Sequence, residues 1–461
     1  MAGKYQAYPE YKDSGIECLG MLPSHWVVQS LSIASRRISV GLATSVTEYY
    51  RDEGVPIIRN MNIKEGYFDG SDMLYLDEKF ATANSGKVVY EGDVIAVHTG
   101  SNLGLACIVP EEFDNCHTFT TLIVTTSEEL LNRYLTYCIN SAYGKAEVHR
   151  LKFGFGKDNL NVKEFKCFYT LIPEYFEQEK IVNFLDHETA KIDTLIEKQQ
   201  QLIKLLKEKR QALISHAVTK GLNPNAPMRD SGVEWLGEVP EHWDVCRVKQ
   251  ITNFITSGPR GWSDYLSENG EDIFLQSGDL NYKLGLELAG AKKVSPPSNA
   301  EGVRTKLENG DVVVCITGAN TGRVAITPEL DGTVYINQHL SLIRPIKSLM
   351  DSDYLGLVLS SGSVKSYFSV TQYGLKEGLS LSNVGEAPTC RPPLKEQKEI
   401  VKYAMNSSDK YDALESCAEK QVALLRERRT ALISAAVTGK IDVRNWKAPE
   451  PTNIQNKEVA A

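Results

Sequence analysis

A nearly identical phrase occurs twice in this chain, and this duplication constrains the fold more than any other feature. The phrase "DSGIECLGMLPSHW" begins at Asp13, and "DSGVEWLGEVPEHW" begins at Asp230, 217 positions later. From Tyr11 to Trp26, 9 of 16 positions match the second copy. A repeat of this kind within 461 residues predicts two similar structural units.

Two further blocks recur in the same order. "GDVIAVHTGSNLGLACIVP" (92–110) returns as "GDVVVCITGANTGRVAITP" (310–328), 218 positions later. The block from "EQEKIV" to "ALISHAVT" (177–219) returns 219 positions later, at 396–438. Between these blocks the halves differ. The sequence therefore predicts a tandem duplication with a shared frame and two individual contents.

The first part of each half has the pattern of a β-rich domain. Short apolar runs such as "VPIIRNMNI" (55–63) and "DVIAVHT" (93–99) lie between clusters of Gly, Asn, Asp and Ser. Such runs are typical of strands separated by turns. A short helix is expected at about 128–140.

The second part of each half predicts one long helix. Apolar residues follow a heptad frame from Ile181 to Leu213 without Gly or Pro, and a weaker frame follows Pro393. Proline before the frames, and Gly221 and Gly439 after them, suit the two ends of a helix.

Two such helices offer each other matching apolar stripes. A helix of about 45 residues is about 67 Å long, which exceeds the diameter of a small domain. Each helix could pack only on its own domain, but antiparallel pairing is favoured, with one domain at each end of a rod. The predicted pairing residues are Ile192, Leu195, Leu202, Leu206 and Leu213 in the first helix and Tyr411, Leu414, Leu425 and Leu432 in the second.

Composition narrows the class of protein. The net charge of −8 disfavours coating of nucleic acid through bulk charge, so any basic surface must be local. The nine cysteines are scattered singly, which predicts neither a disulfide framework nor a zinc site. No apolar leader or membrane-length run is present, so we expect a cytoplasmic chain without membrane partners.

Catalytic and metal-binding motifs are missing from the sequence. There is no phosphate-binding G-x-x-x-x-G-K-[ST] loop, no N-P-P-[FYW] motif of amine methyltransferases and no H-E-x-x-H. The segments 173–180 and 392–398 faintly resemble a nuclease pattern, but they suit the first turns of the long helices better. His25 and His242 recur beside Trp and are interpreted as packed structural residues rather than ligands. We therefore predict no catalysis and no bound metal.

Three blocks together carry a resemblance to a known family. "DSGVEWLGEVPEHW", the "GDVVV" turn and the "EQKEIV" helix ending "ALISAAVTGKIDV", each given twice, resemble the specificity subunit of type I restriction-modification systems. The resemblance covers about residues 11–443. One departure is Cys18, where the other half has Trp235.

The resemblance implies a fold and partners. The fold class would be α+β, with two tandem β-rich α/β target recognition domains joined by two long antiparallel coiled-coil-like helices. Each domain would bind one half of a bipartite, asymmetric site in double-stranded DNA. The implied partners are two modification subunits, which bind S-adenosylmethionine and methylate adenine, and restriction subunits, which use ATP and Mg²⁺ to translocate and cleave; this chain would bind no cofactor. The implied segments are recognition domains at 11–172 and 222–391, spacer helices at 173–221 and 392–442, and a flexible tail at 443–461.

Side chains that recognise different sequences should lie where the halves differ. Loops near 40–45, 59–62, 98–102 and 150–159, and their counterparts in the second half, are therefore candidates. Segment 145–166 holds six Lys or Arg against three acids. The predicted DNA-binding residues are Thr44, Arg59, Asn60, Asn62, Ser101, Asn102, Lys152, Lys157, Asn159, Arg260, Trp262, Gln276, Ser277, Asn320, Arg323, Gln372, Tyr373 and Lys376.

Three alternatives stay open. Asn102 and Asn320 recur at the same turn, so they either stabilise that turn or contact phosphate in both domains. The chain could instead be a protein–protein scaffold without DNA recognition, which the acidic net charge suggests and a DNA filter-binding assay would test. It could also be an enzyme of unknown motif, which would bind S-adenosylmethionine without a partner.

Overall fold

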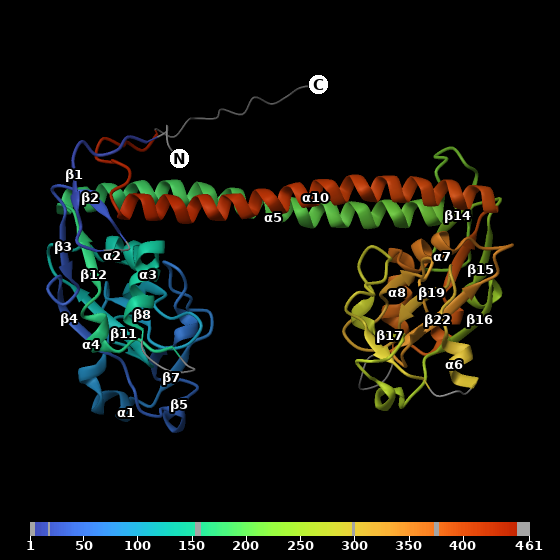
Figure 1. Cartoon of the computed structure of the whole chain (residues 1–461), viewed down its shortest axis with the longest axis horizontal. Helices are drawn as coiled ribbons and strands as arrows, with labels where there is room; N and C mark the ends of the chain where they lie inside the picture. The colour runs from blue at the N-terminus through green and yellow to red at the C-terminus, as the bar shows by residue number, and fades with distance from the viewer. Residues whose placement is uncertain (1–4, 17–18, 153–157, 297–299, 373–377, 450–461) are drawn as a thin grey trace. The chain divides into compact units, whose positions relative to one another are not determined.

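The chain folds into two compact units, shown in the computed structural model of Figure 1. The structure describes residues 5–16, 19–152, 158–296, 300–372 and 378–449. The first unit comprises 1–199 and 420–461, and the second comprises 200–419. The units therefore do not coincide with the two sequence repeats, because each combines one β-rich domain with parts of both long helices.

The domain of the first unit is built on two four-stranded sheets. One sheet is antiparallel and has the order β4 (Ser35–Val40), β11 (Thr121–Thr126), β8 (Val94–Val97), β9 (Ala106–Ile108). The other has the order β10 (His117–Thr118), β6 (Val55–Ile58), β7 (Leu74–Leu76), β5 (Tyr50–Arg51), with β10 and β6 parallel.

Strand β8 explains why part of the sequence reads as a continuous apolar run. Val94 and Ala96 belong to one core cluster, and Ile95 and Val97 belong to another. Since successive side chains of a strand point to opposite faces, a strand covered on both faces needs apolar residues throughout. In the second unit, β19 (Val312–Cys315) alternates between two clusters in the same way.

Short helices and paired strands complete the first domain. The helix expected at 128–140 forms as α2 and begins at Asn132. The helices are α1 (Glu78–Ala83), α2 (Asn132–Asn140), α3 (Ala142–Leu151) and α4 (Val162–Phe165), with 3₁₀ turns η1 (Thr47–Tyr49), η2 (Asn60–Asn62), η3 (Ser85–Lys87) and η4 (Glu111–Phe113). The separate strand pairs are β1 (Tyr11–Asp13) with β2 (Met21–Pro23), and β3 (Val27–Ser30) with β12 (Tyr169–Ile172).

The domain of the second unit repeats this plan. Its antiparallel sheet has the order β16 (Thr252–Ser257), β22 (Leu340–Pro345), β19, β20 (Val324–Ile326), and its smaller sheet has the order β18 (Lys292–Val294), β17 (Asp272–Leu275), β21 (Val334–Ile336). The strand pairs are β13 (Met228–Asp230) with β14 (Glu238–Pro240), and β15 (Asp244–Arg247) with β23 (Pro388–Arg391). The helices are α6 (Ala300–Thr305), α7 (Ser352–Leu359), α8 (Gly362–Thr371) and α9 (Leu381–Glu386), with η5 (Val248–Gln250), η6 (Trp262–Tyr265) and η7 (Ser277–Asp279).

The two long helices predicted from the heptad frames are confirmed as α5 (Tyr175–Lys220) and α10 (Leu394–Val437). Gly221 (φ 72°) follows α5, and Gly439 (φ 68°) lies two residues beyond α10; both adopt the left-handed conformation that ends many helices. In the second unit the helices are antiparallel, because Lys207 and Arg210 of α5 pair with Glu415 and Asp412 of α10 in reverse order. No helix within the described ranges is long and apolar enough to span a membrane.

The predicted register of the helix frames is wrong at three positions. Leu195, Leu202 and Leu414 are 47%, 43% and 54% exposed, so they are not buried in a seam. Ile192, Leu206 and Leu432 are buried as expected, and Leu213, Tyr411 and Leu425 are half-buried. Ile196 and Ile203 take the inner positions beside Leu195 and Leu202. Because Leu195 and Ile196 are neighbours and both apolar, the heptad pattern fits either of them as the inward-facing residue. Packing within each unit decides which one lies inside.

Candidate nucleic-acid interface

The repeated opening phrase connects each domain to the start of its following helix. In the first unit the buried carboxylate of Glu177 on α5 accepts hydrogen bonds from Tyr8 Oη (2.6 Å) and Trp26 Nε1 (3.1 Å), and it lies 2.8 Å from His25 Nε2. In the second unit His242 Nε2 lies 2.9 Å from Glu396 of α10. The histidines therefore pack against the helix start, as the sequence pattern suggested.

The glutamine after that glutamate fixes the helix start from the other side. Gln178 accepts a bond from the Leu131 amide (2.8 Å), and its Nε2 donates to two backbone carbonyls. Gln397 does the same around the Asp351 amide (2.8 Å) in the second unit. The "EQ" dipeptide is thus a structural joint, and this accounts for its presence in both halves.

The aspartate of each "GDV" block stabilises the central sheet. Asp93 is 1% exposed, pairs with Arg37 of β4 and accepts a bond from the Tyr90 amide (2.9 Å). Asp311, also 1% exposed, accepts two bonds of 2.8 Å from Arg344 of β22. Arg37 lies on β4 and Arg344 lies on β22, which are not equivalent strands. The ion pair therefore occurs in both halves, although the arginine occupies a different position in each. The shared blocks therefore form a supporting frame.

The divergent loops of the first domain are connected through the ends of its strands. The Phe119 amide donates to Ile58 O (2.8 Å), and the Leu42 amide donates to Thr118 O (2.7 Å), which connects loops 40–45 and 59–62. The Leu160 amide donates to His98 O (3.0 Å), which places segment 158–160 beside loop 98–102. We call these segments the first loop cluster.

The loops of the second domain are connected in the same way. Asn320 Nδ2 donates to Ser277 O (3.1 Å), and the Gly258 amide donates to Asn337 O (3.2 Å). Thr317 forms a bridge with Gly378 and contacts His339 Nδ1 at 2.5 Å. Loops 256–262, 276–279, 317–323, 337–339 and 378–380 make up the second loop cluster.

Two predicted DNA-binding residues are corrected by their burial. Asn62 is 2% exposed, and its amide group bonds the Arg59 amide and the carbonyls of Asp69 and Asp72. Trp262 is 2% exposed and packs against Phe274 and Tyr335. Both stabilise their own loop from inside, which the polar or aromatic character of a loop residue does not reveal.

Several predicted cations are already engaged within the chain. Arg59 bonds Asp72, and Arg323 bonds Leu280 O (3.0 Å) and stacks on Tyr282. In segment 145–166, Lys145 pairs with Glu65, Arg150 with Glu147 and Lys152 with Asp158, at 3.3, 2.7 and 3.0 Å. These cations are therefore paired, but only Glu65 is an acid from outside the segment, so most of the local excess of positive charge remains.

The remaining predicted residues lie on or near the cluster surfaces. Thr44, Ser101, Asn102 and Arg260 are exposed, while Asn60, Gln276, Ser277, Asn320 and Gln372 are half-buried. Asn159 bonds Asn161 (3.1 Å). Lys157, Tyr373 and Lys376 lie outside the described residues. The side-chain bond of Asn320 to Ser277 supports a turn-stabilising role for that residue, whereas Asn102 is exposed at the equivalent turn.

Unpaired polar atoms gather in the first loop cluster. Arg59 Nε, Asn60 Oδ1, His98 Nδ1 and Asn159 Oδ1 are buried without a hydrogen-bond partner among the described residues. Burial also lowers the pKa of His98, which favours the neutral form of its ring. Buried polar groups are normally paired, so such loops suit a surface that rearranges on a polar ligand.

The sequence interpretation missed two candidate contact residues. Gln338 is half-buried and His339 exposed, and both lie beside Thr317 in the second loop cluster. The polar triplet "NQH" (337–339) interrupts an apolar strand pattern, and this interruption was the available signal. Among the described residues, no three His, Cys, Asp or Glu side chains are grouped to hold a metal ion.

The geometry defines a class of protein with two domains of the same fold. Each domain carries a polar loop cluster, and the two clusters differ in sequence. Residues 41–205 and 240–422 match the family model of the type I restriction modification DNA specificity domain. The chain belongs to this family, and its function is the recognition of DNA sequence.

Known relatives extend over almost the whole chain. The specificity subunit of the type I restriction enzyme EcoKI from Escherichia coli K12 is 23% identical over 96% of this chain and 94% of its own length. The EcoBI specificity subunit, also from E. coli, is 24% identical over 96% and 92%.

Solved structures share the fold. A chain from a type I restriction-modification system, solved to explain complex assembly and conformational transition, gives a TM-score of 0.70 at 18% identity, covering 91% of this chain and 99% of that one. The HsdS subunit of Thermoanaerobacter tengcongensis gives 0.52 at 17% identity, covering 91% and 98%.

Proposed function

We propose that this chain directs a type I restriction-modification complex to a bipartite, asymmetric DNA site. The observation that carries the proposal is the contrast between the two units. Each unit keeps equivalent joints, at Glu177 and Glu396 and at Asp93 and Asp311, yet supports loops of different composition. Two different loop clusters on one frame suit two different half-sites.

Different residues are then proposed to contact the DNA bases and the phosphates. The loop residues that differ between clusters, such as Asn60 and Gln338, are proposed to contact base edges. Asn102 and Lys152 are proposed to contact phosphate; Lys152 would exchange its ion pair with Asp158 for one with DNA.

Two modification subunits are proposed as partners. Leu195 (47% exposed) and Leu424 (63%) lie on the helices of the first unit, and Leu205 (52%) and Leu414 (54%) lie on those of the second. Leu414 and Leu424 follow Leu195 and Leu205 by 219 positions, so the same apolar feature occurs once in each unit. A feature presented twice suits a partner that binds twice, and exposed apolar groups often mark such interfaces.

Catalysis is assigned to the partners. We place S-adenosylmethionine on the modification subunits, and ATP and Mg²⁺ on the restriction subunits, with no cofactor on this chain. We also propose that the chain works in the cytoplasm, where such a complex would meet cellular DNA. Binding of S-adenosylmethionine to the isolated chain, measured by calorimetry, would contradict this assignment.

The test is to express the chain with modification subunits of its own system and to map methylated adenines in host DNA. We expect two short, unlike sequence blocks separated by a fixed number of unspecified bases. A chain with Arg260, Gln338 and His339 replaced by Ser should lose one block only. A palindromic motif, or simultaneous loss of both blocks, would contradict the proposal.

A further inference from the structure

The same ion pair between α5 and α10 occurs in both units. In the first unit Arg429 Nε donates to Asp193 Oδ1 (2.9 Å), and in the second Arg210 lies 3.0 Å from Asp412. Arg429 follows Arg210 by 219 positions, and Asp412 follows Asp193 by 219. The two pairs are therefore equivalent in the repeat, and each lies where the domain approaches the helices.

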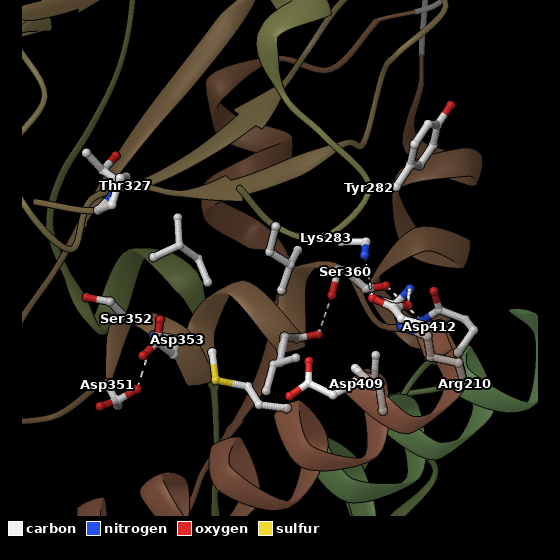
Figure 2. A pocket seen from close by; sticks show the side chains of 18 of the residues that line it. Arg210, Tyr282, Lys283, Thr327, Asp351, Ser352, Asp353, Ser360, Asp409 and Asp412 are labelled. Carbon is white, nitrogen blue, oxygen red and sulfur yellow. Dashed lines mark hydrogen bonds and ion pairs between the residues drawn. The ribbon is translucent and has the colours of Figure 1, made fainter. Parts of the chain in front are cut away.

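Each domain contacts its pair through one loop side chain, and the two side chains have opposite charge. Glu65 in the first domain lies 3.2 Å from Arg429. Lys283 in the second domain lies 2.8 Å from Asp412 and, in Figure 2, extends from the domain loop toward Asp412 and Arg210. The first loop thus uses the basic member of the pair, and the second loop uses the acidic member.

The second unit also contains two cations, Lys365 and Arg210, that are placed to pair with an acidic loop residue. Lys145 of α3 contacts the other oxygen of Glu65 (3.3 Å), and its counterpart Lys365 of α8, 220 positions later, bonds Gln211 Oε1 (2.8 Å) instead. Burial and then the nearby Arg210 lower the pKa of Lys365. Arg210 Nε is buried without a hydrogen-bond partner in the described part of the chain.

We infer that the repeated Arg–Asp pair is a docking point that accepts a recognition-domain loop of either charge, with Glu65 and Lys283 as the positioning residues. The helices then carry domains of unrelated loop sequence without adapting to each one. Only the purpose of this docking rests on the proposed function. The contact itself is a property of the isolated chain.

The test is hydrogen–deuterium exchange of the peptide covering 280–286 in the purified full chain. Lys283→Met should raise its exchange rate about two- to fivefold, as loss of an exposed ion pair allows. Lys283→Arg and Lys283→Glu should both return the rate to within about twofold of the wild type. Exchange in Lys283→Met equal to the wild type, or in Lys283→Glu as fast as in Lys283→Met, would overturn the inference.

A second substitution identifies the partner of the new acid. In Lys283→Glu, adding Arg210→Gln should remove the protection, whereas Arg210→Gln alone should keep it because Lys283 still binds Asp412. Protection retained in the double variant, or lost in Arg210→Gln alone, would contradict the docking point. Lys293→Met, at an exposed lysine of β18, is the matched control, and equal unfolding temperatures show that all variants are folded.

Discussion

One buried acid supports the central sheet of each domain. Asp93 and Asp311 are almost fully buried, and each is compensated by one arginine and by one backbone amide. Removing one partner of such a pair leaves an uncompensated charge or donor, which costs about 3–5 kcal/mol. The repeat therefore preserves the acid, while the arginine comes from β4 in the first domain and from β22 in the second.

This predicts a domain-specific defect. Asp93→Ala should destabilise the first domain by about 3 kcal/mol because Arg37 loses its buried partner. Chemical denaturation of the full chain should then show an earlier first transition. In the assembled complex, methylation should tolerate changes in the first half-site, while discrimination in the second half-site is unchanged. Equal effects on both half-sites would contradict the independence of the domains.

His98 predicts a pH dependence of stability. Burial lowers the pKa of its ring, so the folded state disfavours the protonated form. As the pH falls below the ordinary value of about 6.5, the unfolded state takes up the proton first and stability decreases. Between about pH 7.5 and about pH 5.5, the unfolding temperature should fall less in His98→Ile, which copies Ile316 of the other half, than in the wild type. His149→Gln, at an exposed histidine, should behave as the wild type does.

At the scale of elements, the existence of both long helices could be predicted, but their inner face could not. The apolar period and the flanking Pro and Gly residues determine where α5 and α10 begin and end. Leu195 and Ile196 are adjacent and equally apolar, so periodicity alone does not decide which one lies inside. That choice depends on packing within each unit. The same limit applies to the loops. Their difference between the two halves is visible in the sequence, whereas the burial of Asn62 and Trp262 depends on tertiary contacts.

The corrected register makes a prediction that separates the two helix faces. Leu206→Asp should cost several kcal/mol because Leu206 is 9% exposed and the new charge would be buried. Leu195→Asp should change the free energy of unfolding by less than about 0.5 kcal/mol, since Leu195 is 47% exposed. Leu195→Asp should nevertheless weaken binding of a modification subunit in pull-down titrations. If Leu195→Asp unfolded the chain, Leu195 would lie in the helix seam, as the heptad frame predicted.

For the whole molecule, the division of the chain separates recognition from spacing. Both long helices contribute residues to both units, whereas each β-rich domain belongs to one unit. Half-site sequence should therefore depend on the domains, and the number of bases between half-sites should depend on the helices. Family resemblance implied this division, and the way each helix is shared between the units provides the structural reason for it.

Lengthening both helices at the division between units tests this separation. One heptad inserted into α5 between Gln199 and Gln200, and one into α10 between Glu419 and Lys420, keeps the heptad phase in each helix. Seven residues add about 10.5 Å of helix, which corresponds to about three base pairs of DNA at 3.4 Å each. Methylation mapping should give both original half-sites with a spacer about three bases longer. A heptad in α5 alone should disrupt pairing and reduce methylation, which provides the control. Altered half-sites with the original spacer would show that the helices, rather than the loop clusters, determine sequence recognition.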